Sequence, residues 1–253
     1  MKLFRLFPLL LLLLPFASCK DGGSEEAPKV KLNVTFRALY DGQPLEKYKE
    51  YAYGDSKLFY DRFNTYLSDL SLVVGGTKTK LSDIEWVDFT PDQATNNLAV
   101  EVKRTYEVPS GQYDAFSLGF GVKSDLNAKQ PADFPAEHPL SRENEYWTGW
   151  KSYIFTKVQG RYDLNLDGTP EANVFYHTGS DAAYVTYKKN LNLNIQDDTD
   201  LVIEFDLKKL MTFNGQVLDL NVSSNRTTSH SADNVALGVK VMNNLSNATE
   251  FKL

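Results

Sequence analysis

The sequence has a single cysteine, Cys19, and only three histidines, His138, His177 and His230. With one cysteine the chain cannot form an internal disulfide bond, and a zinc or iron–sulfur site built on several cysteines is excluded. Basic residues are also too few to outweigh the acidic ones, since the formal net charge is −6. Because nucleic-acid binding relies on a basic patch, we expect no nucleic-acid partner.

The first 18 residues have the organisation of a secretory signal peptide. Lys2 and Arg5 precede an apolar run around Leu9–Leu14 that is too short to cross a bilayer, which takes about 20 residues. The following "FASC" is similar to a bacterial lipobox. We therefore predict that residues 1–18 are removed and that Cys19 becomes lipidated. The alternative is ordinary signal-peptidase cleavage nearby, which would leave Cys19 as a free thiol.

A polar spacer follows the cysteine. "KDGGSEEAPK" contains two glycines and a proline, a composition typical of flexible tethers, so residues 19–29 form the lipidated cysteine and its tether. Lys20 stands where some lipoproteins have the aspartate that retains them in the inner membrane. The acidic residues are similar to export signals of surface lipoproteins in Bacteroidetes-like bacteria. We expect a cell-envelope protein that is lipid-anchored to the outer membrane, with display on the surface as a further expectation.

Alternating apolar and polar residues dominate the rest of the chain. In Val30–Leu39, Val30, Leu32, Val34, Phe36 and Ala38 share one face, which predicts a half-buried strand. Gly75 and Gly76 separate two further extended runs and predict a tight hairpin. Helical spacing appears only late, in residues 231–245. Many strands and one late helix predict an all-β fold over residues 30–253: an antiparallel β-sandwich of immunoglobulin-like, Greek-key type with a short C-terminal helix.

One loop matches the start of a calcium-binding motif. "DLNLDG" places Asp163, Asn165 and Asp167 at alternate positions before Gly168, which permits a sharp turn. The match ends at the twelfth position, where Val174 replaces the expected glutamate. The loop is therefore either a weak calcium site or an Asx-rich turn between two strands.

The sequence has no nucleophile-elbow motif and no phosphate-binding glycine loop. Carboxylates are plentiful, but no pair stands out as a glycosidase pair. We therefore expect a protein without enzymatic activity.

Three segments carry distinctive motifs that follow one another along the chain. The first, "YWTGWKSYIFTKVQG", has two tryptophans ahead of a tyrosine-led strand ending in Lys-x-x-Gly. The second, "VFYHTGSD", places His177 in a His-x-Gly context. The third, "HSADNVALGVKVMNNLSNATEF", begins with His230 ahead of a short helix. Each motif is short, but in their order and spacing the three segments resemble the MbnP-like family of copper-associated β-sandwich proteins.

The resemblance implies a copper site formed by His177 and His230, with His138 as a third candidate. It also implies that Trp147 or Trp150 lines the site or is modified, and that a dihaem peroxidase-like protein is a partner. The two tryptophans are three positions apart here, whereas the family usually spaces them two apart. Trp147 is therefore the better candidate for a functional residue, and Trp150 for the core or a partner surface.

Two interpretations of function follow from the sequence. The first is a non-enzymatic, copper-binding lipoprotein of the cell envelope, because imidazole is a favoured copper ligand. The second is a surface-displayed lipoprotein that binds carbohydrate or peptide through exposed aromatic residues, without a transition metal.

Overall fold

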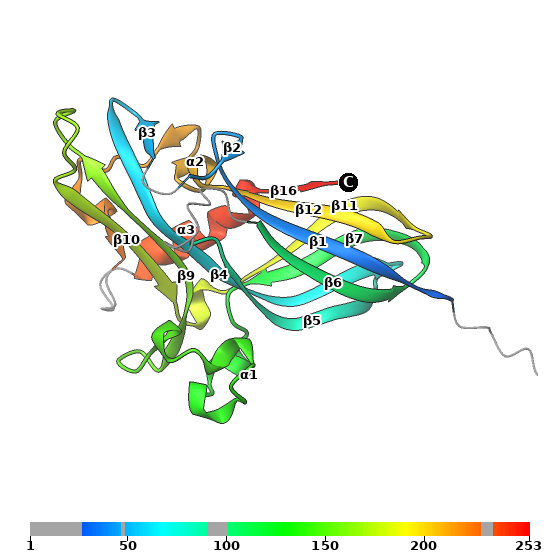
Figure 1. Ribbon diagram of the computed structural model, residues 1–253. Coiled ribbons are helices and arrows are strands. Elements are labelled where there is room, and N and C mark those ends of the chain that lie inside the picture. The colour runs from blue at the N-terminus through cyan, green and yellow to red at the C-terminus, as the bar shows by residue number, and fades with distance from the viewer. Residues whose placement is uncertain (1–26, 47–48, 91–100, 229–234) are drawn as a thin grey trace, which may run out of the picture.

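The computed structural model describes residues 27–46, 49–90, 101–228 and 235–253, which form two large sheets and a small hairpin (Figure 1). Five strands form the first sheet: β16 (Thr249–Lys252), β12 (Thr199–Asp206), β1 (Lys29–Tyr40), β6 (Glu101–Pro109) and β2 (Gln43–Pro44). Nine strands form the second: β11 (Val185–Ile195), β7 (Gly111–Phe120), β4 (Ser56–Val74), β9 (Ser152–Asp163), β10 (Ala172–Gly179), β15 (Thr227–Thr228), β3 (Glu50–Tyr53), β5 (Thr77–Asp88) and β8 (Tyr146–Trp147). The hairpin pairs β13 (Thr212–Phe213) with β14 (Gln216–Val217).

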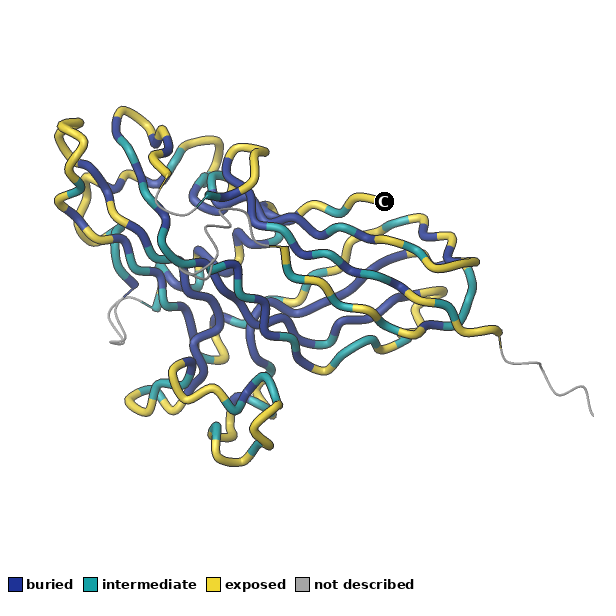
Figure 2. The backbone as a smooth tube through the Cα atoms, in the orientation of Figure 1, coloured by how far each residue is buried: buried dark blue, intermediate teal, exposed yellow. Residues whose placement is uncertain are grey.

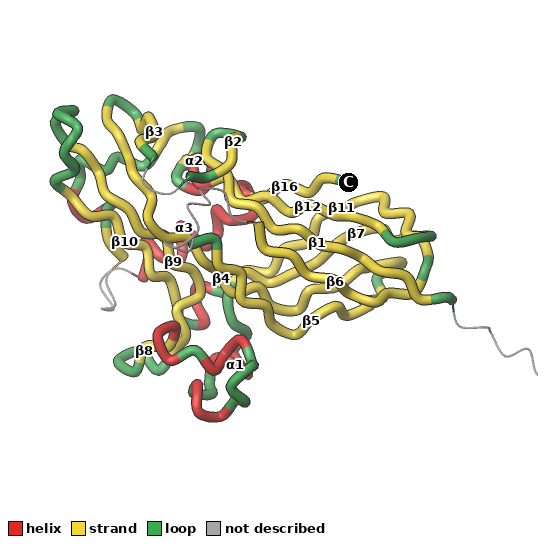
Figure 3. Tube along the Cα trace, viewed as in Figure 1, coloured by secondary structure: helices red, strands yellow, loops and turns green. Residues whose placement is uncertain are grey.

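Helices are short and lie outside the sheets, many of them in the segment between β7 and β9 (Figure 3). The α-helices are α1 (Ser124–Asn127), α2 (Leu207–Leu210) and α3 (Val235–Ala248). The 3-10 helices are η1 (Pro131–Asp133), η2 (Pro139–Ser141), η3 (Glu143–Glu145), η4 (Asp181–Ala183) and η5 (Ser223–Asn225). Within the described ranges, none of the helices has both the length and the apolar character needed to cross a membrane.

The first strand forms as its alternation predicts. Leu32, Val34, Phe36 and Ala38 are buried, while the residues between them are exposed or half-buried. β1 lies at the centre of its sheet, antiparallel to β6 and parallel to β12. Its inward face therefore forms one wall of the core.

The long strand β4 organises the second sheet. Its first half pairs with β3 and β9, and its second half pairs with β5 and β7. Gly75 and Gly76 connect β4 to β5 with φ values of 55° and 84°, so the predicted hairpin is confirmed. Both values lie in the left-handed region that glycine adopts without steric cost. Because one strand spans the whole sheet, β4 links the β9–β10 region to the β5–β7 region.

The two sheets meet through an aromatic cluster. The ring of Phe205 on β12 lies 6.4 Å from that of Phe36, 6.1 Å from that of Phe63 on β4 and 5.7 Å from that of Phe89. Buried positions follow the inner strands, whereas loop tips and the segment between β7 and β9 are largely exposed (Figure 2). Burial of large aromatic side chains is the main stabilising contribution of such a core.

Two features of the predicted fold need correction. The mostly β character is confirmed, but the sheets are mixed, because β1 pairs with β12 and β10 with β15 in parallel. The late helix is also confirmed as α3, yet it is not the last element, since β16 follows it and pairs with β12. The immunoglobulin-like Greek-key order stays a prediction.

Candidate functional site

His177 lies on β10 at the centre of the candidate site. Its Nε2 lies 2.6 Å from the amide nitrogen of Gln159 on the neighbouring strand β9. Which of the two atoms donates in this contact depends on the tautomer of the ring. The contact with Gln159 holds the orientation of the histidine ring.

The backbone of His177 is bound by Thr228 on β15. The hydroxyl of Thr228 accepts from the His177 amide at 2.8 Å and donates to its carbonyl at 3.0 Å. From the other side, α3 packs against β10, and Gly238 lies close to both Thr228 and Thr178. His230 lies outside the described residues, as do residues 1–26 with Cys19. Along the chain, the segment that contains His230 lies between Thr228 and α3, and both of these contact β10.

Trp147 and Trp150 form a ring pair beside the same strand. Their ring centroids are 5.0 Å apart at an interplanar angle of 43°, and both side chains are half-buried. Gly179, two positions after His177, leaves room for Trp150, since a Cβ there would lie 3.3 Å from the indole ring. The third tryptophan, Trp86, is buried in the core instead. The two half-buried indoles thus form a surface next to β10.

A buried ion pair lies next to His177 across the strands. Lys157, the register partner of His177 on β9, has its Nζ 2.7 Å from Oε2 of Glu145, and both side chains are almost fully buried. Lys157 also donates to the carbonyl of Asn144. Burial raises the pKa of Glu145, although the Lys157 ammonium opposes the shift. The pair fixes the segment that precedes Trp147 onto β9.

A polar row continues from Lys157 across the sheet. Asn64 on β4 is the register partner of both Lys157 and Asp88, so side chains from four strands lie in one row that ends at His177. Asn64 is buried, and its Oδ1 accepts no hydrogen bond from the residues that the structure describes. Sequence reasoning did not identify this row, because its members are scattered over four strands.

The structure does not bring His138 to His177. His138 caps η2 by accepting from the Leu140 amide through Nδ1 at 3.1 Å, and its ring stacks on Phe134. η2 packs against β5, and β4 and β9 lie between β5 and β10. Three inter-strand spacings separate β5 from β10, so the strand that η2 packs against lies about 14 Å from the strand that carries His177. Burial, followed by the Lys129 charge, lowers the pKa of His138.

The predicted calcium loop connects β9 to β10 with its own hydrogen bonds. Asp163 is buried and accepts from the amides of Asn165, Leu166 and Gly168. The carboxylate oxygens of Asp163, Asp167 and Glu171 lie within 4.8 Å of one another. Sequence reasoning missed Glu171, which approaches from the ninth position of the motif. Calcium takes six to eight oxygen ligands, so three carboxylates alone are an incomplete set, and this site stays a prediction.

The Asp163 hydrogen bonds lead to a stability prediction. Asp163→Ala should lower the free energy of unfolding by about 2 kcal/mol, because three backbone amides lose a charged acceptor. Urea unfolding without added calcium would measure this loss. Asp167→Ala, at an exposed position, is the matched control and should cost under about 1 kcal/mol. Equal losses in the two variants would contradict the structural role of Asp163.

Comparisons with known proteins identify relatives. The family model MbnP matches residues 29–232. A solved structure, MbnP from Methylosinus trichosporium, is similar with a TM-score of 0.52 and 16% sequence identity, over 72% of this chain and 78% of that one. At this identity the likeness shows a shared fold. A search of curated proteins found no match.

Proposed function

Because the chain belongs to the MbnP family, we propose that it is a non-enzymatic, copper-binding lipoprotein of the cell envelope. The observation behind the proposal is the placement of His177. It is held by Gln159 and Thr228, and it lies on β10, where Gly179 lies against the ring of Trp150. The residues present also suit the metal, since imidazole nitrogen is a good ligand for copper.

The proposed ligands are His177 and His230. The segment containing His230 starts after Thr228, which bonds to His177, and ends at α3, which packs against β10. His138 is left out because it caps η2 on the far side of two strands. Trp147 and Trp150 would exclude water from one side of the metal. When bound, copper would supply a redox-active cation at this edge of the sheet.

Copper titration of the demetallated protein tests the proposal. The His177→Ala/His230→Ala double variant should bind copper at least about 100-fold more weakly, because each histidine supplies a ligand nitrogen. His138→Ala is the matched control and should keep the parent affinity. An unchanged affinity in the double variant, with the fold intact by circular dichroism, would refute the histidine site.

We also propose that Cys19 is lipidated and anchors the protein to the outer membrane. A dihaem peroxidase-like protein is the proposed partner that acts on the anchored protein. The intact mass of the native protein would report the lipid, any bound metal and any oxidation of Trp147 or Trp150. A mass matching an unmodified chain from another cleavage site would refute the anchor.

A second candidate function is binding of carbohydrate or peptide. The half-buried indole pair favours it, because aromatic faces exposed at a surface can stack on sugars or side chains. Tryptophan fluorescence distinguishes the two functions. Quenching by copper and not by glycans supports the first, and the reverse supports the second.

A further inference from the structure

A second site lies at the junction of α2, the β13–β14 hairpin and α3. These elements and the turn after β1 line an open pocket of about 730 Å³. None of its lining residues belongs to the site around His177. Its volume is in the range of small-molecule pockets, which measure about 300–1,000 Å³.

The lining of the pocket has more basic than acidic side chains, although the protein is acidic overall. Lys208, Lys209 and Lys240 line the pocket, and Asp41 is the only carboxylate among the lining residues that the structure describes. Lys208 pairs with Asp41 at 2.7 Å and Lys209 pairs with Glu250. These pairs are partly exposed to solvent, where such contacts are weak, so the lysines can turn to a ligand at little cost.

Lys240 on α3 is the least compensated of the three cations. Among the described parts of the chain, no carboxylate pairs with it, and its Nζ lies 4.2 Å from the ring centroid of Phe213. A cation over an aromatic face keeps its positive charge and remains able to donate hydrogen bonds. The exposed amide of Asn243, one turn along α3, adds a neutral donor and acceptor to the same wall.

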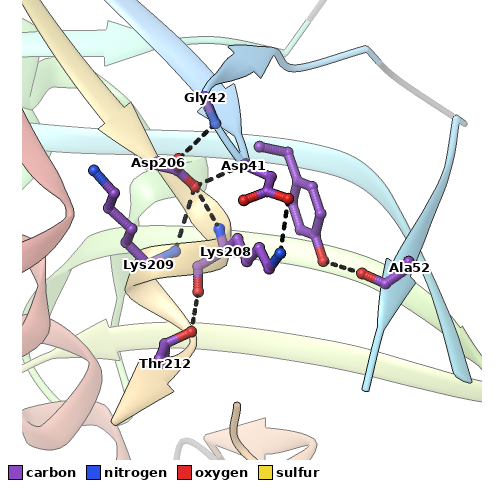
Figure 4. Close-up of polar contacts among 8 residues, drawn as sticks. Asp41, Gly42, Ala52, Asp206, Lys208, Lys209 and Thr212 are labelled. Carbon is purple, nitrogen blue, oxygen red and sulfur yellow. Dashed lines mark hydrogen bonds and ion pairs between the residues drawn. The ribbon is translucent and has the colours of Figure 1, made fainter. Parts of the chain in front are cut away.

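The backbone that holds these side chains is fixed before any ligand binds. The side-chain amide nitrogen of Asn244 donates to the carbonyls of Lys209, Leu210 and Thr212. These hydrogen bonds join α3 to the end of α2 and the start of β13. Asp206 holds the start of α2 and the turn at Asp41 together, as Figure 4 shows. A prearranged site loses less entropy on binding than one that must be assembled.

We propose that this pocket binds a small organic anion with two or more carboxylate groups. The cations come from two helices and not from one point, so they match separated negative charges better than a single compact one. In Figure 4 the side chains of Lys208 and Lys209 extend in different directions from α2. The pocket volume also exceeds what one inorganic phosphate would fill.

Isothermal titration of the full chain tests the proposal, with citrate as the polycarboxylate probe and inorganic phosphate as the compact one. Citrate should bind more tightly than phosphate. Lys240→Gln should weaken citrate binding at least about fivefold, because it removes a charged hydrogen-bond donor. Lys103→Gln, at a lysine whose side chain is 72% exposed on β6, is the control and should leave citrate binding unchanged.

Three results would overturn the proposal. They are an absence of citrate binding, tighter binding of phosphate than of citrate, and equal losses in Lys240→Gln and Lys103→Gln. Thermal melting of both variants checks that each is folded. The pocket shares no residue with the copper site, so the His177→Ala/His230→Ala variant should bind citrate like the parent protein.

Discussion

Replacing Lys157 by methionine should lower the free energy of unfolding by about 3–5 kcal/mol at pH 7.5. Both side chains of the Lys157–Glu145 pair are almost fully buried, at 6% and 7% exposure. The Lys157 ammonium lies 2.7 Å from Oε2 of Glu145, so the buried carboxylate depends on this cation for compensation. Methionine has a similar length but no charge, and it leaves a buried carboxylate without compensation.

The loss should depend on pH. Burial raises the pKa of Glu145 in the folded protein, and Lys157 opposes that shift. A raised folded-state pKa contributes stability below the unfolded value of about 4.3, and that contribution is lost as pH rises through the folded pKa. Removing the ammonium raises the folded pKa further, so the deficit of Lys157→Met relative to the parent should shrink between pH 7.5 and pH 5. Urea unfolding at several pH values would measure it.

A double variant separates the buried charge from side-chain packing. Glu145→Gln combined with Lys157→Met removes both charges and should recover at least half of the stability lost in the single variant. Lys103→Met, at an exposed lysine of β6, is the control for the substitution itself and should cost under about 1 kcal/mol. A deficit independent of pH, or a double variant no better than Lys157→Met, would contradict the role of the pair.

Local patterns predicted the elements that depend on neighbouring residues. The alternation of β1, the Gly75–Gly76 hairpin and the late helix all follow from backbone preferences and burial within one segment. The late helix is present as α3, and its buried face includes Gly238, Met242 and Leu245. The parallel pairing of β1 with β12 was not predictable, because the two strands are more than 150 residues apart. The pairing also leaves no pattern in the sequence of either strand that would identify its partner.

The candidate site was predicted in part for a similar reason. Motif order pointed to His177 and to the tryptophan segment, which the structure places against the same strand. Lys157 and Glu145 were missed because a lysine in a strand and a glutamate in "ENE" usually lie at the surface. In the structure every residue from Ser152 to Val158 is buried, so this strand has no solvent-exposed face on which Lys157 could lie.

Replacing Asp206 by alanine should lower the free energy of unfolding by about 3 kcal/mol. Its buried carboxylate accepts from four backbone amides: those of Asp41 and Gly42 in the turn after β1, and those of Lys208 and Lys209 at the start of α2 (Figure 4). One side chain thus joins two chain segments that are about 165 residues apart. Alanine would remove the charged acceptor that these four amides share, and with it the link between the two segments.

Asp200 on the same strand gives the matched control. It is exposed and accepts from the side chain of Asn33, so Asp200→Ala should cost under about 1 kcal/mol. Asp206→Asn keeps one acceptor oxygen, so its free energy of unfolding should lie between those of the parent and Asp206→Ala. Because the Asp206 contacts also position Lys208 and Lys209, citrate binding should weaken together with stability in Asp206→Ala. Stability equal to that of Asp200→Ala would show that the two segments are joined by the core and not by this carboxylate.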